Sequence, residues 1–149
     1  MRVRDAEARD AKAWASLREE LWPGSAGDHA REIAAYFRGE PPRWVCLVAE
    51  DDSGGLAGFL EVGLRDYAEG CRTSPVGYLE GIYVRPTSRS SGVGRKLVEA
   101  AEAWARRQGC TEMASDRELD NARSGRFHRA LGYEEVERIV CFRKDLGGA

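Results

Sequence analysis

The most informative segment of the sequence is Arg89-Ser90-Ser91-Gly92-Val93-Gly94, which stands between a strand-like segment and a helical one. Its glycines let the backbone bend and let a ligand come close to it. The first amides of the following helix lack internal partners, and the positive end of the helix dipole lies behind them. Arg89 and Arg95 add fixed positive charge with a geometry that suits phosphate. The turn therefore predicts an anion site suited to a diphosphate.

Two well-known phosphate motifs do not fit this turn. A dinucleotide-binding fingerprint fails because Leu97 stands where the third glycine should be. A P-loop fails because Lys96 is followed by Leu97 and not by Ser or Thr, and the glycines do not have the spacing of the G-x-x-x-x-G-K-[ST] pattern. Taken alone, the turn is also compatible with a generic strand-to-helix connection whose glycines only reverse the chain.

Hydrophobic periodicity on both sides of the turn predicts an α/β domain with a mixed sheet. The helix after the turn is expected to reach Gln108, with Gly109 as its C-cap. The other expected helices are Ala8 to Trp22, Asp28 (as N-cap) to Arg38, ended by Gly39 with Pro41-Pro42, and Asn121 to Leu131. The expected strands are Arg2 to Asp5, Trp44 to Ala49, Leu56 to Leu64, Val76 to Val84, Thr111 to Ser115, Tyr133 to Arg138 and Ile139 to Lys144.

The bulk composition is that of one globular domain, residues 1–149. A net charge of −2 gives no general reason to bind nucleic acid or an anionic membrane, and no apolar run is long enough to cross a bilayer. Four widely spaced cysteines predict a cytoplasmic protein with free thiols. With only His29 and His128 in the chain, we expect no His/Cys metal site.

Three separated motifs resemble the GNAT superfamily of acyl-CoA transferases. Arg89 to Gly94 fits the R/Q-x-x-G-x-G/A signature, and Tyr78 to Val84 followed by Arg85-Pro86 looks like the fourth strand of that family. Asn121 and Ala130-Leu131-Gly132-Tyr133 resemble its second cofactor motif. The likeness spans essentially the whole chain in the same element order. It implies a GNAT fold, with a mostly antiparallel sheet flanked by helices and splayed between strands 4 and 5.

The resemblance also implies acetyl-CoA as cosubstrate, with no metal. Pantetheine would enter the gap between strands 4 and 5 like an extra strand, bonded by main-chain groups of Ile82 and Val84. The amides of the turn would bind the pyrophosphate. The cofactor-binding residues carried over are Ile82, Val84, Arg89, Ser90, Ser91, Gly92, Val93, Gly94, Arg95, Asn121 and His128.

More local stretches resemble the chromosomal-type aminoglycoside 6′-N-acetyltransferases. They are Leu21-Trp22-Pro23-Gly24, Gly70 to Val76, Leu79-Glu80-Gly81-Ile82, Glu112 to Asp116, and Glu134 to Arg138. This likeness implies that the 6′-amine of an aminoglycoside attacks the thioester carbonyl of acetyl-CoA, and that the enzyme confers resistance. Relatives of this class often form dimers, partly through the C-terminal strands, so we also expect a homodimer.

The residue types agree with a polycationic, hydroxyl-rich substrate, which calls for carboxylates and a flat surface for a sugar ring. Glu80 and Asp116 are expected at two strand ends that meet near the thioester, and Glu137 is a third candidate carboxylate. Trp22 and Tyr67 are candidates to pack on the sugars, although Trp22 suits a core position equally well and Tyr67 could simply cover a loop. Glu137 is also compatible with a solvated strand face. Negative charge at the mouth would steer a cation inward.

For catalysis, Glu80 is the first choice for binding the acceptor ammonium and passing its proton to water, and Asp116 is the second. A carboxylate inside an apolar strand costs free energy unless a cation pairs with it, which favours a functional Glu80. The Val84 amide, or one near it, would polarise the thioester carbonyl. His128 stands where many family members have a tyrosine acid, and a histidine could serve as that acid. A lone helical histidine is more often structural or cofactor-contacting, and a coenzyme A thiolate can leave without a dedicated acid, so the acid role is the less favoured one.

Two other functions remain open at this point. The same chemistry could acetylate a polyamine, a protein N-terminus or a lysine. The domain could instead be a CoA-binding sensor that has lost catalysis, although the complete turn and the strand-end carboxylates argue against it.

Overall fold

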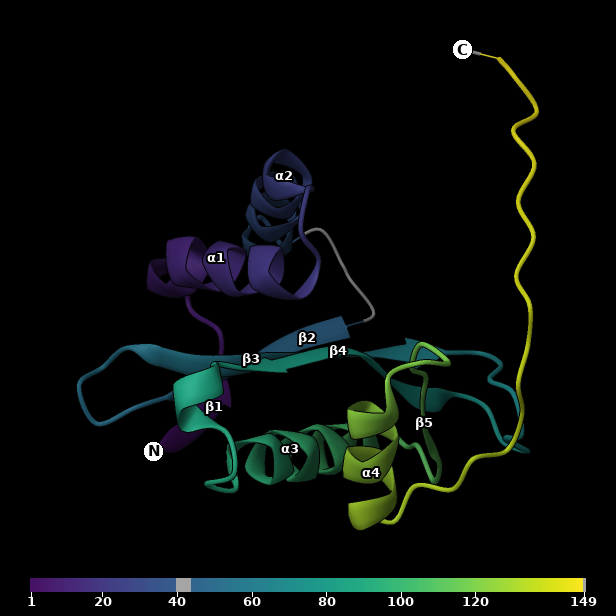
Figure 1. Cartoon of the computed structure of the whole chain (residues 1–149). Coiled ribbons are helices and arrows are strands. Elements are labelled where there is room, and N and C mark those ends of the chain that lie inside the picture. The colour runs from purple at the N-terminus through teal and green to yellow at the C-terminus, as the bar shows by residue number, and fades with distance from the viewer. Residues whose placement is uncertain (40–43, 149) are drawn as a thin grey trace.

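The computed structural model describes residues 1–39 and 44–148, and it is built on one five-stranded sheet with the order β1-β2-β3-β4-β5 (Figure 1). Strands β1 to β4 are antiparallel to one another, whereas β4 and β5 run parallel. The strand bounds are β1 Arg2–Asp5, β2 Trp44–Glu50, β3 Leu56–Arg65, β4 Val76–Val84 and β5 Met113–Ser115. The mixed, mostly antiparallel sheet is therefore confirmed.

Helices cover both faces of this sheet (Figure 1). Helices α1 (Ala11–Leu21) and α2 (Ala26–Phe37) lie on one face, and α3 (Val93–Arg107) and α4 (Ala122–Ala130) lie on the other. None of the helices in the described ranges is long and apolar enough to cross a membrane.

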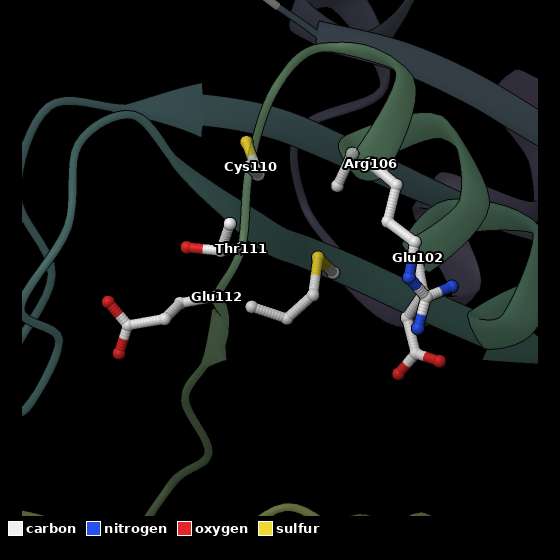
Figure 2. Close-up of a pocket in the computed structure, with 7 residues that line it drawn as sticks. Glu102, Arg106, Cys110, Thr111 and Glu112 are labelled. Carbon is white, nitrogen blue, oxygen red and sulfur yellow. The ribbon is translucent and has the colours of Figure 1, made fainter.

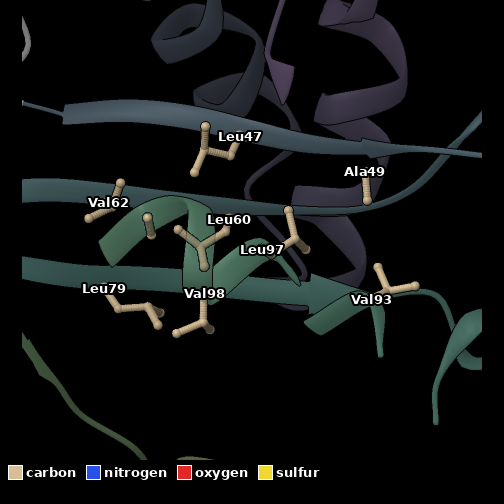
Figure 3. Packing of buried hydrophobic residues seen from close by; sticks show 9 residues of the cluster. Leu47, Ala49, Leu60, Val62, Leu79, Val93, Leu97 and Val98 are labelled. Carbon is tan, nitrogen blue, oxygen red and sulfur yellow. The ribbon is translucent and has the colours of Figure 1, made fainter. Parts of the chain in front are cut away.

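The core beneath α3 fixes the start of that helix against the middle of the sheet. Leu97 and Val98 are fully buried and face apolar side chains of β2, β3 and β4 (Figure 3). Burying a leucine of this kind is worth about 1.5–3 kcal/mol. Val93, in the first turn of α3, belongs to the same cluster, so the end of the helix that faces the phosphate turn is held by packing.

The opposite face is closed around Trp14 of α1, which packs with Phe59 of β3. An ion pair is buried beside it: the Arg18 Nε donates to Glu61 Oε2 at 2.7 Å, and Nη2 donates to Oε1 at 2.7 Å. The Trp14 indole N–H also donates to Glu61, at 3.0 Å. Because both charges are paired and hydrogen-bonded, the interior tolerates them, and they join α1 to β3.

Three expected elements begin or end differently from the sequence pattern. The first expected helix starts as a 3-10 turn over Ala8–Asp10 before α1. Helix α2 begins at Ala26, so Asp28 lies in its first turn and Ser25 holds the N-cap position. Strand β5 is shorter than expected, beginning at Met113. Pro41 and Pro42 lie outside the described residues.

The two closing strands expected over 133–144 are wrong for this chain. No strand occurs within residues 133–148, all of which the structure describes, and the segment runs away from the body as an extended tail (Figure 1). We call residues 134–148 the C-terminal arm. A strand needs a neighbouring ladder, and the arm leaves the edge strand β5 instead of pairing with it. Its apolar side chains are consequently exposed, Phe142 to 94%.

Candidate functional site

The turn that precedes α3 has the backbone geometry of an anion cradle. Ser90 (φ 66°) and Gly92 (φ 82°) both adopt left-handed conformations. The first helical bond runs from the Lys96 amide to the Gly92 carbonyl at 3.1 Å, so the earlier amides of α3 have no partner within the helix. Left-handed residues before a helix N-terminus gather N–H groups around an anion. The turn fits the diphosphate of coenzyme A.

The two glycines of the signature serve different purposes. Gly92 supplies a positive φ, and a methyl group at that position would meet no atom within 4 Å. Gly94 makes room for α4, since a Cβ there would lie 2.9 Å from the Phe127 ring. The second glycine thus allows α4 to pack closely on α3 beside the turn.

The arginines of the turn also have protein partners. The Arg89 Nε donates to the Val84 carbonyl at 2.8 Å, and its guanidinium lies 5.4 Å from the centre of the Tyr83 ring. The Arg95 Nη2 donates to the Ala130 carbonyl at 3.2 Å. Arg89 therefore ties the turn to the end of β4, and Arg95 ties it to the end of α4.

Strand β4 parts from β5 beside this turn. Their parallel pairing covers only residues 77–79 of β4 against 113–115 of β5, although β4 continues to Val84. Beyond Leu79, this edge of β4 has no strand partner among the described residues. Unpaired ladder groups at such a gap suit an amide-bearing ligand such as pantetheine, which can add as a strand.

A β-bulge at Glu80 marks the point where the strands part. Glu61 of β3 faces Gly81 and the next residue, Val62, faces Leu79, so Glu80 is the extra residue on β4. A bulge re-aims the side chain of its extra residue and sharpens the twist of the strand. Glu80 lies within β4, as expected, but its side chain is 38% exposed, so its burial costs less free energy than that of a fully buried carboxylate.

The two candidate catalytic carboxylates belong to one chain of contacts. Arg65, the last residue of β3, donates to both Glu80 oxygens at 3.0 and 2.8 Å. Its guanidinium stacks 3.5 Å from the centre of the Tyr78 ring. The Tyr78 hydroxyl donates to Asp116 Oδ2 at 2.6 Å. Burial and the Asp116 carboxylate together raise the pKa of Tyr78, so the phenol remains a donor at neutral pH.

A groove of about 780 Å³ opens beside β5, and Tyr78 and Asp116 lie on its wall. Arg65, His128 and Glu137 also line it, whereas Glu80, Trp22 and Tyr67 do not. Val136 of the C-terminal arm closes over Gly70, where a Cβ would lie 2.5 Å from its methyl carbon. A smaller hollow of about 200 Å³ adjoins the groove between the end of α3 and the chain leading into β5 (Figure 2).

His128 and Asn121 are both engaged within the α4 region. The Asn121 side chain caps α4 by accepting the Ser124 amide at 3.1 Å. The His128 Nδ1 donates to the Ser124 carbonyl at 2.7 Å, which leaves Nε2 to accept from the Ser115 hydroxyl at 2.8 Å. Both ring nitrogens of His128 are therefore engaged, one with α4 and the other with β5.

The two aromatic candidates differ in their surroundings. The Trp22 ring is half-buried and presses on the bulged strand, since a Cβ on Gly81 would lie 2.5 Å from it. Tyr67 is 69% exposed in the loop after β3. Trp22 is therefore next to Glu80 in the fold, whereas Tyr67 borders the site only through its loop.

Sequence reasoning missed Arg65, Tyr78 and Ser115. Tyr78 is two residues before Glu80 on β4, so strand alternation was the signal that could have found it. Arg65 is opposite Val76 in the β3–β4 register and reaches along β4 from there. The contact between Arg65 and Glu80 depends on how β3 and β4 are paired, and this register cannot be read from the sequence.

A model of the acetyltransferase (GNAT) family matches residues 12–133, and the chain belongs to this family. It is 47% identical over 146 residues to an aminoglycoside N(6′)-acetyltransferase type 1 of Klebsiella aerogenes, with 97% of this chain and 96% of that protein covered. It is also 43% identical to the enzyme of the same name from Serratia marcescens, covering 91% and 92% of the two chains.

Solved structures give the same picture. The apo aminoglycoside 6′-N-acetyltransferase AAC(6′)-Ig of Acinetobacter haemolyticus superimposes with a TM-score of 0.90 at 40% identity, covering 99% of this chain and 100% of that one. AAC(6′)-Iy in complex with a CoA-acetylneamine bisubstrate analogue also gives 0.90, at 36% identity and 97% coverage of both chains. The cofactor predicted from the turn is thus the one that family members bind.

Proposed function

We propose that this chain is an acetyl-CoA-dependent aminoglycoside 6′-N-acetyltransferase and that its activity confers aminoglycoside resistance. The observation that carries the proposal is the bulge at Glu80, which sets a paired carboxylate where β4 parts from β5. A second carboxylate, Asp116, follows the end of β5 and is joined to the first through Tyr78 and Arg65. Relatives that share this fold bear the same activity in their names.

In the proposed reaction, the carboxylates first bind the acceptor ammonium. One proton then passes from it to water, and the carboxylates orient the resulting free amine. The free 6′-amine attacks the thioester carbonyl, a C–N bond forms and the nitrogen releases its second proton to water. The C–S bond then breaks, and coenzyme A leaves as a thiolate. Glu80 is the main ammonium ligand and Asp116 supports it. A main-chain amide near Val84 polarises the carbonyl oxygen.

The leaving thiolate needs no dedicated acid in this scheme. The His128 proton is held on Nδ1 by the Ser124 carbonyl, and Nε2 already accepts the Ser115 hydroxyl. His128 and Asn121 instead shape the α4 side of the cofactor site, and the amides of residues 90–95 bind the pyrophosphate. Glu137, Trp22 and Tyr67 border the sugar-binding region.

An amine panel with acetyl-CoA and free-thiol detection tests the substrate class. We expect thiol release with aminoglycosides that carry a 6′-amine and none with matched 6′-hydroxyl compounds. Turnover with polyamines or peptides alone would contradict the proposal. Coenzyme A binding without turnover on any amine would favour a sensor.

The role of Glu80 is tested by Glu80→Gln. We expect kcat/KM for the aminoglycoside to fall at least ~10-fold, because a charge-assisted bond to the ammonium is lost. The KM for acetyl-CoA should stay within twofold. The matched control is Glu99→Gln, at an exposed position of α3. Unchanged kinetics in Glu80→Gln would remove this residue from the mechanism.

We also propose that two copies form a homodimer by exchanging their C-terminal arms. Val140, Phe142 and Leu146 of the arm are exposed by 77, 94 and 87%, too much apolar surface for an isolated tail. The outer edge of β5 has no strand partner among the described residues, and the part of the arm beyond Cys141 lines no part of the adjoining groove. A second copy satisfies both needs at once, since each arm can pair beside the β5 of the other.

Light scattering on the protein as it elutes from a size-exclusion column tests this assembly. We expect twice the chain mass for the wild type and a monomer for Phe142→Asp, with loss of most activity because the groove is left open. Ala30→Asp, at an exposed position of α2, controls for the added charge. A monomeric, fully active wild type would overturn the proposal.

Finally, we infer a cytoplasmic location. Cys46, Cys71, Cys110 and Cys141 are all free thiols, as expected in a reducing compartment. Recovery of the activity in a periplasmic extract instead of the cytoplasmic fraction would contradict this inference.

A further inference from the structure

The turn that joins α1 to α2, residues 22–25, borders the proposed acceptor site. Trp22 presses on Gly81, the neighbour of the bulge residue Glu80. Pro23 and Gly24 are exposed, and Gly24 (φ 94°) has no other part of the chain within 4 Å of a Cβ placed there. Apolar packing therefore fixes the indole of Trp22 but not the backbone that carries it.

Two polar side chains hold that backbone instead. The His29 Nε2 donates to the Trp22 carbonyl at 3.1 Å. The Gly24 amide donates to Glu19 Oε1 at 2.6 Å. Glu19 comes from α1 and His29 from α2, so each of the two helices fixes one point of the turn that joins them.

The direction of the His29 contact is set by Arg18. Its Nη1 lies 3.4 Å from His29 Nδ1, and a guanidinium only donates, so Nδ1 accepts and the proton resides on Nε2. His29 is 4% exposed. The carboxylate of Glu19 also lies near the ring, with its Oε2 3.5 Å from the His29 Nε2. Arg18 also donates to Glu32, at 2.6 Å.

Arg18 in turn is anchored on β3 through its buried pair with Glu61. Glu61 is the residue opposite Gly81, on which Trp22 rests. The contacts therefore form a closed path from β3 through Arg18 and His29 to Trp22 and back to β4. A fixed path of this kind keeps the indole at one distance from the carboxylate at the bulge.

We propose that His29 and Glu19 are positioning residues that hold the Trp22–Gly24 turn as a rigid wall of the acceptor site and thereby set acceptor affinity. This inference rests on the proposed function, because it requires Trp22 to face the aminoglycoside. Neither residue touches the reacting atoms. Their effect passes through the backbone of the turn.

The first test is a KM-against-kcat split. His29→Phe keeps a planar ring, though a larger one, and removes the bond to Trp22, so the aminoglycoside KM should rise about 5- to 10-fold, the equivalent of one buried hydrogen bond. The acetyl-CoA KM should not change. His29→Gln, which restores a donor, should recover part of the loss, and Glu19→Gln should raise the same KM more weakly. Glu99→Gln, at an exposed position of α3 on the other face of the sheet, is the matched control.

A double-mutant cycle with Trp22→Ala separates positioning from general stability. If His29 acts through Trp22, its substitution should change the aminoglycoside KM by less than twofold once the indole is absent. An undiminished effect in the Trp22→Ala background would overturn the inference, as would a His29→Phe enzyme with wild-type KM values. If Trp22→Ala alone leaves the aminoglycoside KM unchanged, the placement of Trp22 in the acceptor site fails, and the inference fails with it.

Discussion

Tyr78 shows how a single hydroxyl can organise the site. It joins Asp116 to the Arg65–Glu80 pair, because its O–H donates to one carboxylate while its ring carries the guanidinium that binds the other. The raised pKa of the phenol keeps this donor protonated across the pH range in which the acceptor amine reacts. In the proposed reaction, the two candidate carboxylates are therefore oriented before the acceptor binds.

Tyr78→Phe is expected to lower kcat/KM for the aminoglycoside about 10- to 100-fold, the equivalent of one hydrogen bond to a charged group. The ring and its stacking with Arg65 remain, so the acetyl-CoA KM and the melting temperature should change little. Steady-state kinetics on both substrates measure this. Tyr36→Phe, which removes a hydroxyl in the core far from the groove, should leave the kinetics alone.

At the scale of elements, the start of α3 depends on how closely α4 approaches it. Gly94→Ala would place a methyl group 2.9 Å from the Phe127 ring, so α4 must shift. We expect a loss of about 1–3 kcal/mol of stability, as for other overpacked contacts, together with weaker coenzyme A binding.

Gly94→Ala/Phe127→Leu should restore most of both losses, because the smaller side chain makes room. Gly92→Ala should not be rescued by Phe127→Leu, since its cost of about 1 kcal/mol is a backbone strain. Chemical denaturation and coenzyme A titration distinguish the two glycines. Equal rescue of both would show that the two positions share one cause.

The junction of β1 with α1 predicts a pH dependence. Arg4 donates to both Asp10 oxygens, at 2.7 and 3.0 Å, and holds the pKa of that carboxyl below its ordinary value of 3.8. A lowered folded-state pKa stabilises the fold above the unfolded value and loses that contribution as the pH falls through the folded one. Asp10→Asn should therefore lower stability near pH 7 and flatten the decline below about pH 4, relative to the exposed control Asp120→Asn, in urea titrations.

The sequence predicted elements whose causes are local. The apolar stripe of α3 and the continuous run of β2 follow from periodicity, and both helices and strands appear near their expected places. The bulge at Glu80 depends on the register between β3 and β4, so its exposure and its pairing with Arg65 were not predictable from the strand alone. The arm has strand-like residues, but where a strand finds its partner is a non-local property.

For the molecule as a whole, the proposed exchange of arms makes the thermal stability depend on the protein concentration. If two copies exchange arms, unfolding releases two chains from one assembly, and the melting temperature should rise with protein concentration. Calorimetry over a hundredfold range of concentration measures this. A chain shortened to residues 1–133 should melt at one temperature at every concentration.

The arm that leaves its own body also has a consequence in genetic terms. In the proposed dimer, the arm of each chain completes the groove of the other. A defective carboxylate therefore impairs the site on its own chain, whereas a defective arm impairs the site on the partner chain. A cell that carries one copy with Glu80→Gln and another with Phe142→Asp could then assemble one fully working site from two impaired alleles. Resistance in such a strain, and in neither parent, would be intragenic complementation between the two ends of this chain.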